Sequence, residues 1–243
     1  MLPHKGLIFS SWMTQNGVST SEQTSYSASG WIERLAQGVY IKSGSTPTVF
    51  SAVASYNEQL CKNCFIGAST ALDIHGFTHF VPMGKQTAYL FTSKTERLPT
   101  WLLEHEWDMN IHYSTTKIFG NQMIGVERTN VSDFGLYVSS PERAFMECLH
   151  LSPKYYSAMD LYYVMEMLTT LRPQLVRQLL EQCSSVKVKR LFMYMAEKAQ
   201  HQWFHALKGS IIKLGDGKRS FARNGAYSSN YMITIPKELA EYE

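Results

Sequence analysis

The chain has 243 residues, a formal net charge of +3, 44% hydrophobic residues and 18% charged residues. This composition excludes a disordered chain, and the length suffices for one to two domains with a proper core. No stretch approaches the roughly 18 apolar residues of a membrane helix, and the first residues lack a signal peptide's apolar run, so we expect a cytoplasmic protein without membrane contact. The scattered cysteines, which we expect to be free thiols, are Cys61, Cys64, Cys148 and Cys183.

The first 45 residues predict two short helices followed by a hairpin. The first helix spans about 10–15 and ends at Asn16-Gly17, because glycine tolerates the left-handed backbone that closes a helix. A second helix, capped by Ser19 or Thr20, runs to about Ala28. Strands are expected over 31–35 and 39–42 around a turn at 36–38. This order is typical of a winged helix-turn-helix with its core over residues 8–44.

The second helix is unusually polar, with the sequence Thr-Ser-Glu-Gln-Thr-Ser over residues 20–25. Small hydroxyl and amide side chains suit a helix that lies in the major groove, where they reach base edges and phosphates. The alternative is a solvent-exposed helix on an unrelated module. The pattern by itself favours neither interpretation.

The rest of the chain predicts a mixed α+β region with a boundary at the polar, proline-terminated stretch 93–99. We therefore expect an N-terminal region over 1–95 and a C-terminal domain over 96–243. The expected helices lie at 48–60 and 69–76, from Ser140-Pro141, around 161–168, from Pro173 and over 188–196. The expected strands lie at 87–92, 109–117, 122–127 and 136–138, with short extended pieces over 209–235.

Basic residues are concentrated between Lys187 and Arg223, where only Glu197 and Asp216 oppose them. On the helix after Ser185, one face carries the apolar stripe. The opposite face is predicted to carry Lys187, Arg190, Tyr194, Lys198 and His201. Such a face is a footprint for nucleic acid or for an acidic partner, and the alternative is an ordinary solvated helix face.

We find no convincing active site, and we predict a protein that is not an enzyme and binds neither cofactor nor metal. Cys61-x-x-Cys64 has metal-ligand spacing but no second ligand pair, and His75 and His79 are interrupted by Gly76. The segment 214–219 does not meet the spacing of a phosphate-binding loop. Glu104, Glu106 and Asp108 occupy every second position, so on a strand they would share one solvent-exposed face. No partner motif gives these carboxylates a catalytic role.

Five blocks of sequence, in order, resemble AbiEi-type antitoxins, the transcriptional regulators of bacterial type IV toxin–antitoxin operons. The first block is Tyr26-x-x-Ser-Gly-Trp-Ile-x-Arg-Leu-x-x-Gly-Val-Tyr40, and the second is Gly67-x-Ser-x-Ala-Leu-x-x-His-Gly76. The later blocks are Ser-Pro-Glu-Arg-Ala at 140–144, Val-Lys-Arg-Leu-Phe at 188–192 and Leu-Gly-x-Gly-Lys-Arg at 214–219. The matches run from about Trp12 to Arg219.

The resemblance implies a winged helix-turn-helix followed by a mixed α+β antitoxin domain. It also implies that the protein binds inverted repeats upstream of its own operon, represses that operon, and counteracts a nucleotidyltransferase-like toxin without requiring a stable complex with it. One departure concerns the start of the chain. A helix usually precedes the position of Trp12 in the family, and only eleven residues do so here, which implies a winged domain that is trimmed or lacks its first helix.

These considerations give two sets of candidate residues. The second helix would face base edges with Thr20, Ser21, Gln23 and Thr24, and Gln23 could pair with adenine as donor and acceptor. The wing would touch phosphate or the minor groove with Arg34, Gln37 and Lys42, while Trp31 and Tyr40 would pack the wing onto the helices. The candidate antitoxin surface comprises Lys187, Lys189, Arg190, Lys218 and Arg219. The alternative function is a protein-interaction module that docks an acidic partner on its basic C-terminal face without binding DNA.

Overall fold

The computed structural model describes residues 6–78, 84–93, 95–115, 117–207 and 212–242. The fold is mixed α+β, as predicted, and the chain divides into two compact units. Unit 1 comprises Met1–Ile66, Pro82–Thr115 and Arg128–Tyr137, and unit 2 comprises Gly67–Val81, Thr116–Glu127 and Val138–Glu243. Among the helices in these described ranges, none has the length and apolar character needed to cross a membrane.

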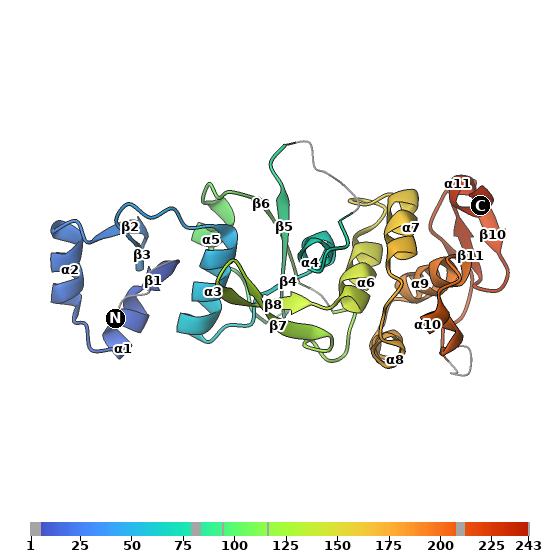
Figure 1. Cartoon of the computed structure of the whole chain (residues 1–243), viewed down its shortest axis with the longest axis horizontal. Helices are drawn as coiled ribbons and strands as arrows, with labels where there is room; N and C mark the ends of the chain where they lie inside the picture. The colour runs from blue at the N-terminus through green and yellow to red at the C-terminus, as the bar shows by residue number, and fades with distance from the viewer. Residues whose placement is uncertain (1–5, 79–83, 94, 116, 208–211, 243) are drawn as a thin grey trace. The chain divides into compact units, whose positions relative to one another are not determined.

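Unit 1 begins with a small winged helix-turn-helix, drawn in blue in Figure 1. Its elements are β1 (Leu7–Phe9), α1 (Ser10–Gln15), α2 (Thr20–Ala28), β2 (Ile32–Ala36) and β3 (Val39–Lys42), and the antiparallel sheet has the order β1-β3-β2. The two predicted helices and the hairpin are confirmed. Ile8, Met13 and Ile32 form the buried core, against which Tyr26 and Tyr40 pack. Gly17 follows α1 and Gly30 follows α2, and both have positive φ, a backbone conformation that glycine adopts easily and that lets each helix end there.

The strand β1 occupies the place before α1 where the resemblance leads one to expect a helix. The later helix α3 (Val49–Leu60) packs beside it and satisfies its backbone. Ser55 Oγ accepts a hydrogen bond from Leu7 N at 2.9 Å, and Gln59 Oε1 accepts one from Phe9 N at 3.0 Å. Gln59 Nε2 in turn donates to Leu7 O at 2.7 Å. The winged domain therefore has a complete sheet, and a helix that follows the wing in sequence supports it.

The larger sheet has five strands in the order β6-β5-β4-β8-β7. They are β4 (Phe65–Ile66), β5 (Thr87–Thr92), β6 (Asn110–Thr115), β7 (Val126–Val131) and β8 (Phe134–Ser139), with α5 (Thr100–Glu104) between β5 and β6. β5 and β6 are parallel and pair from Thr87↔Asn110 to Thr92↔Thr115. The boundary expected near residue 95 thus falls between two paired strands, and a cut there would divide the sheet.

Two local predictions in this region are wrong. The carboxylates of residues 104–108 do not lie on a strand, because α5 ends at Glu104 and a bend follows. Asp108 instead accepts a hydrogen bond from Val49 N at 2.8 Å and caps the start of α3. The strand expected over 122–127 begins only at Val126, after a turn.

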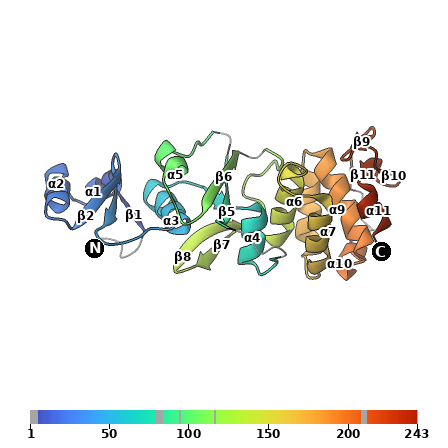
Figure 2. The same ribbon diagram turned by 90° about the horizontal axis from the view of Figure 1, so that it is seen from above.

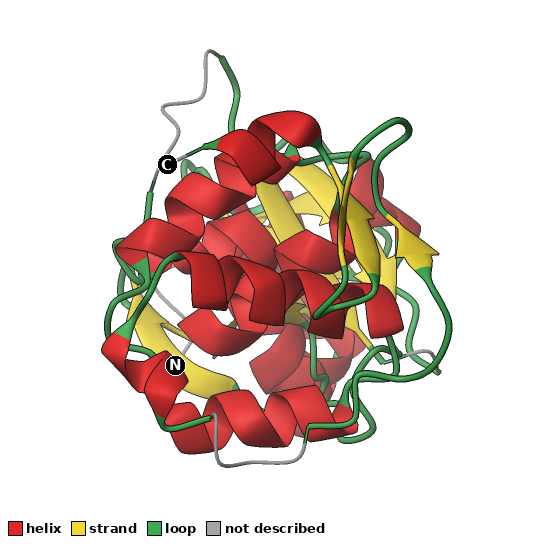
Figure 3. Cartoon of the chain, turned by 90° about the vertical axis from the view of Figure 1, so that its right-hand side faces the viewer, coloured by secondary structure: helices red, strands yellow, loops and turns green. Residues whose placement is uncertain are grey.

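Unit 2 is mainly helical; its helices α6, α7 and α9 are labelled in Figure 2, and Figure 3 shows the helices of the chain in red and its strands in yellow. Its helices are α4 (Ala68–Ile74), α6 (Pro141–Leu151), α7 (Ala158–Met167), α8 (Pro173–Gln182), α9 (Val186–Lys198), α10 (Gln202–His205) and α11 (Lys237–Glu241). Its small sheet, of order β10-β11-β9, contains β9 (Arg219–Ser220), β10 (Ala226–Ser228) and β11 (Ile233–Ile235). The start of α6 is confirmed, with Ser140 at the N-cap and Pro141 in the first turn.

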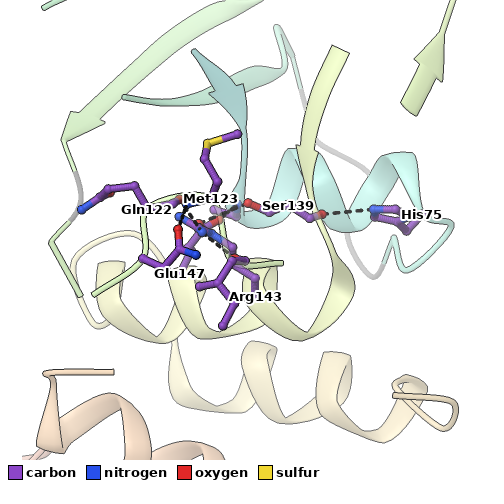
Figure 4. A network of polar contacts seen from close by, with 9 residues as sticks. His75, Gln122, Met123, Ser139, Arg143 and Glu147 are labelled. Atoms are coloured by element: carbon purple, nitrogen blue, oxygen red, sulfur yellow. Dashed lines mark hydrogen bonds and ion pairs between the residues drawn. The ribbon is translucent and has the colours of Figure 1, made fainter. Parts of the chain in front are cut away.

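A buried polar network joins two of the sequence blocks within unit 2 (Figure 4). Arg143 Nε donates to Glu147 Oε1 at 2.7 Å, and its Nη1 donates to the carbonyl oxygens of Gln122 and Ile124 at 2.7 and 2.6 Å. Glu147 Oε2 accepts from Ala68 N at 3.0 Å. The network fixes the turn at 122–125 and the start of α4 onto α6, which is a structural role.

Candidate nucleic-acid interface

The recognition-helix candidate α2 is closed at its start by a reciprocal capping box. Ser19 Oγ accepts a hydrogen bond from Glu22 N at 3.3 Å, and Glu22 Oε2 accepts one from Ser19 N at 2.8 Å. Ser19 Oγ also donates to Glu22 Oε2 at 2.6 Å, and this bond together with the one from Ser19 N lowers the pKa of the Glu22 carboxyl. Beyond the cap, Thr20, Ser21 and Thr24 are exposed, so three of the four residues predicted to face base edges lie on an open surface.

Gln23, the fourth of these residues, is buried and does not face solvent. Only 2% of it is exposed, and its amide bonds three parts of the helix-turn-helix. Oε1 accepts from Ser10 Oγ at 2.6 Å, while Nε2 donates to Thr14 Oγ1 and Val18 O, both at 3.1 Å. The prediction that Gln23 reads adenine is therefore wrong: its amide is already occupied in holding α1, the turn and α2 together.

The wing candidates Arg34, Gln37 and Lys42 are all exposed. The hairpin turn is tied to the helices, because Ser10 N donates to Gly38 O at 2.9 Å. The wing tip and the first half of α2 thus meet at the same residue, Ser10. Over residues 1–47 of the sequence, three cations, Lys5, Arg34 and Lys42, face the two carboxylates Glu22 and Glu33, so this region has a net charge of only +1.

Trp31, at the corner between α2 and β2, is 70% exposed. Its backbone is fixed, since Trp31 N donates to Tyr26 O at 2.9 Å and Ser43 N donates to Trp31 O at 3.1 Å. The prediction that Trp31 packs the wing onto the helices is wrong, whereas the same prediction for Tyr40 is confirmed. The local signal for the exposure of Trp31 is its position directly after Gly30, whose positive φ turns the chain away from the helix face.

The basic face predicted on α9 is covered by the C-terminal segment. Arg190, predicted on this face, is fully buried, and Lys189, predicted only for the antitoxin surface, is 9% exposed, so neither belongs to a surface. Lys189 Nζ donates to Lys213 O at 2.8 Å, Lys198 Nζ donates to Tyr242 O, and the Tyr194 ring meets that of Tyr231. Arg190, Tyr194 and Lys198 on this face therefore anchor later parts of the chain, which corrects the interpretation of these residues as a solvated or partner-binding face.

Arg190 makes the largest contribution to this anchoring. Its guanidinium donates to four carbonyl oxygens: Leu214 at 3.1 Å, Gly215 at 2.6 Å, Gly217 at 2.6 Å and Met232 at 2.9 Å. Two of the acceptors belong to glycines with positive φ, Gly215 and Gly217. The loop that superficially resembled a phosphate loop is therefore wrapped around a buried cation.

The remaining antitoxin candidates differ in exposure. Lys187 is partly buried, and its Nζ donates to His150 O at 3.1 Å and Ser152 O at 2.6 Å. Burial lowers the pKa of this ammonium group. Lys218 and Arg219 are exposed. The open part of the basic C-terminal region thus lies on the segment after residue 212.

The described residues include no group of three or more His, Cys, Asp or Glu side chains able to hold a metal ion. Cys61 is exposed at the end of α3, while Cys64 is buried and desolvation raises the pKa of its thiol. The two cysteines therefore differ in environment, although their spacing is that of a ligand pair. His79 and Lys208 lie outside the described residues.

The helix-turn-helix with its antiparallel wing places the chain in the class of winged-helix regulators. Two family models match it: one described as "Transcriptional regulator, AbiEi antitoxin N-terminal domain" over residues 2–83, and one described as "Transcriptional regulator, AbiEi antitoxin, Type IV TA system" over residues 85–236. The chain therefore belongs to the AbiEi family of type IV toxin–antitoxin transcriptional regulators.

A solved structure shares the fold. The crystal structure of the RV2827C protein from Mycobacterium tuberculosis aligns with 96% of this chain and 87% of its own, with 13% sequence identity and a TM-score of 0.63. No curated protein sequence matches the chain.

Proposed function

We propose that the protein is a DNA-binding antitoxin that represses its own operon in the cytoplasm and counteracts a nucleotidyltransferase-like toxin. The observation that carries DNA binding is the open hydroxyl face at the start of α2, where Thr20, Ser21 and Thr24 are exposed above the buried Gln23. Membership of a family of antitoxin regulators supports both roles.

In this proposal, α2 enters the major groove of an operator made of inverted repeats. Its three exposed hydroxyl side chains contact base edges, or phosphates at the groove rim. Arg34, Gln37 and Lys42 of the wing contact the DNA backbone. The N-terminal region has three cations and two carboxylates, so few phosphates are neutralised there. Each neutralised phosphate adds only about 0.9 to the slope of log affinity against log salt concentration.

We assign toxin control to the exposed part of the basic C-terminal segment, with Lys218 and Arg219 at its centre and Lys187 beside it. Lys189 and Arg190 leave this set because they are buried. A second candidate function keeps the same surface: a module that docks an acidic protein and does not bind DNA. The observation that favours it is the predominance of the exposed cations Lys213, Lys218, Arg219 and Arg223 over the single carboxylate Asp216.

A gel-shift titration of the full-length protein separates the two functions. DNA from upstream of its own gene is compared with unrelated DNA of equal length at several salt concentrations. A regulator binds the upstream DNA preferentially, with an affinity that falls as salt rises. Equal binding to both DNAs, or none, would overturn the operator proposal and leave the interaction module.

A further inference from the structure

The small C-terminal sheet has one buried face and one open face. Its central strand β11 pairs with β10 in antiparallel and with β9 in parallel orientation. Ile233 and Ile235 are buried, with 0% and 1% exposed. Because side chains alternate along a strand, Thr234 points to the opposite face of the sheet.

All three strands contribute to this open face. Tyr227 lies directly opposite Thr234 in β10, and Ser220 is the partner of Thr234 in β9. Tyr227 is 47% exposed, and Lys218 Nζ lies 5.3 Å from the centre of its ring. We call Lys218, Ser220, Tyr227 and Thr234 the platform.

The platform is held in place from beneath. The Arg190 guanidinium bonds the carbonyl oxygens of Gly217 and Met232 at 2.6 and 2.9 Å, and these residues flank Lys218 and Ile233. Arg219 N donates to Met232 O at 3.0 Å, and Phe221 N donates to Thr234 O at 2.8 Å. These bonds hold the backbone of the platform strands in place, so a partner meets strands whose backbone is already fixed.

The segment that carries the platform is rich in positive charge. Lys213, Arg219 and Arg223 are exposed like Lys218, and Asp216 is the only carboxylate between residues 212 and 234. An exposed aromatic ring among cations is the combination that binds single-stranded nucleic acid, in which bases stack on the ring and cations follow the phosphates.

We propose that the platform binds a nucleic acid through an unpaired base that stacks on Tyr227, while Lys218 and Arg223 contact its phosphates. Duplex DNA would use the cations but could not reach the ring, because its bases are stacked on one another. An acidic protein would likewise leave the exposed ring unexplained. The proposal rests on the proposed toxin-control surface for its cellular role, although the binding itself is measured without toxin.

Fluorescence anisotropy of the full-length protein tests the proposal. The probes are a fluorescein-labelled 12-nucleotide oligouridine, the matching oligothymidine and an unrelated DNA duplex. We expect Y227A to weaken single-strand binding about tenfold and to leave duplex binding unchanged, while Y227F retains the wild-type affinity because it keeps the ring. R223A should lower the salt slope for single strands by about 0.7.

Tyr155 provides the matched control, because it is 40% exposed, Lys154 Nζ lies 4.9 Å from its ring, and it does not belong to the C-terminal sheet. Y155A should bind like the wild type. The proposal is overturned if Y227A binds single strands normally, if Y155A loses as much, or if poly-glutamate displaces oligouridine from the wild-type protein as well as unlabelled oligouridine does.

A parallel operator gel shift distinguishes this proposal from the preceding one. The platform proposal is supported if the Y227A protein still prefers operator DNA but no longer binds single strands. Single-strand binding that depends on Tyr227 in a protein without operator preference supports the platform and rejects the operator proposal.

Discussion

Ser10 Oγ donates a hydrogen bond to Gln23 Oε1 at 2.6 Å, and Ser10 N donates to Gly38 O at 2.9 Å. One residue at the start of α1 therefore fixes both the recognition-helix candidate and the wing turn. The two parts of the proposed DNA surface are set relative to each other by this residue. In the proposed function, Gln23 contributes to DNA binding only by holding this surface in place.

We expect Q23A to destabilise the protein by about 1–3 kcal/mol, because the buried Gln23 side chain is lost and its part-buried partners Ser10, Thr14 and Val18 lose their hydrogen bonds with its amide. Urea unfolding of the full chain measures the loss. S21A, on the exposed face of the same helix, should change stability by less than about 0.5 kcal/mol.

The same variant separates positioning from base contact. Q23A should weaken binding to upstream and unrelated DNA by similar factors. A Q23A protein of normal stability that no longer distinguishes the two DNAs would show that Gln23 reads a base after all.

Arg190 should be essential for the order of the C-terminal segment. R190M leaves four carbonyl oxygens without their donor, and we expect a loss of at least about 3 kcal/mol together with faster proteolysis between residues 212 and 232. The exposed R223A serves as control and should resist proteolysis like the wild type. An R190M protein that is stable but fails to counteract the toxin would place Arg190 on the functional surface instead.

The ion pairs Arg143–Glu147 and Arg177–Glu181 have the same spacing but opposite environments. The first is almost fully buried, with side chains 0% and 1% exposed, and the second is 55% and 49% exposed. R143M should cost about 3–5 kcal/mol because it leaves a buried carboxylate unpaired. R177M should cost less than about 1 kcal/mol. Equal effects in chemical unfolding would contradict the structural role of the Figure 4 network.

Glu142 should contribute a pH-dependent part of the stability. Burial raises the pKa of its carboxyl, but hydrogen bonds from Arg172 outweigh burial and hold this pKa below its ordinary value. The stabilisation is therefore complete above the unfolded-state pKa of about 4.3 and is lost as the pH falls through the lower folded-state value.

The measurement is the difference in unfolding free energy between the wild type and R172M at pH 7 and pH 3. We expect up to about 1 kcal/mol at pH 7, because the Arg172 side chain is half exposed, and less at pH 3. A difference that grows on acidification would contradict this assignment.

Local sequence signals were sufficient for most elements. The Ser19–Glu22 capping box, Gly30 after α2 and Ser140-Pro141 before α6 each depend on neighbours a few residues away. β1 carried no such signal, because its backbone is completed by β3 and by side chains of α3 some 50 residues later. The pairing of β5 with β6 across the expected boundary is likewise a long-range property.

The site residues show the same division. Exposure of Thr20, Ser21 and Thr24 follows from helix periodicity, whereas burial of Gln23 depends on acceptors and donors in α1 and the turn. Helix periodicity places Lys187, Arg190 and Lys198 on one face of α9. It could not reveal that backbone carbonyl groups up to 44 residues later in the chain accept hydrogen bonds from Arg190 and Lys198. Charge alone did not distinguish a binding surface from an internal anchor.

The most direct test of the account replaces the open face of α2. In a competition gel shift, labelled upstream DNA is bound by wild-type protein or by the T20A/S21A/T24A variant. Each complex is then challenged with unlabelled upstream DNA or with unlabelled unrelated DNA. The T100A variant, which changes an exposed residue of α5, serves as the control. We expect the variant to remain folded and to lose at least about tenfold of its preference for upstream DNA, while T100A keeps it. A folded variant with undiminished preference would contradict the assignment of α2 to the major groove.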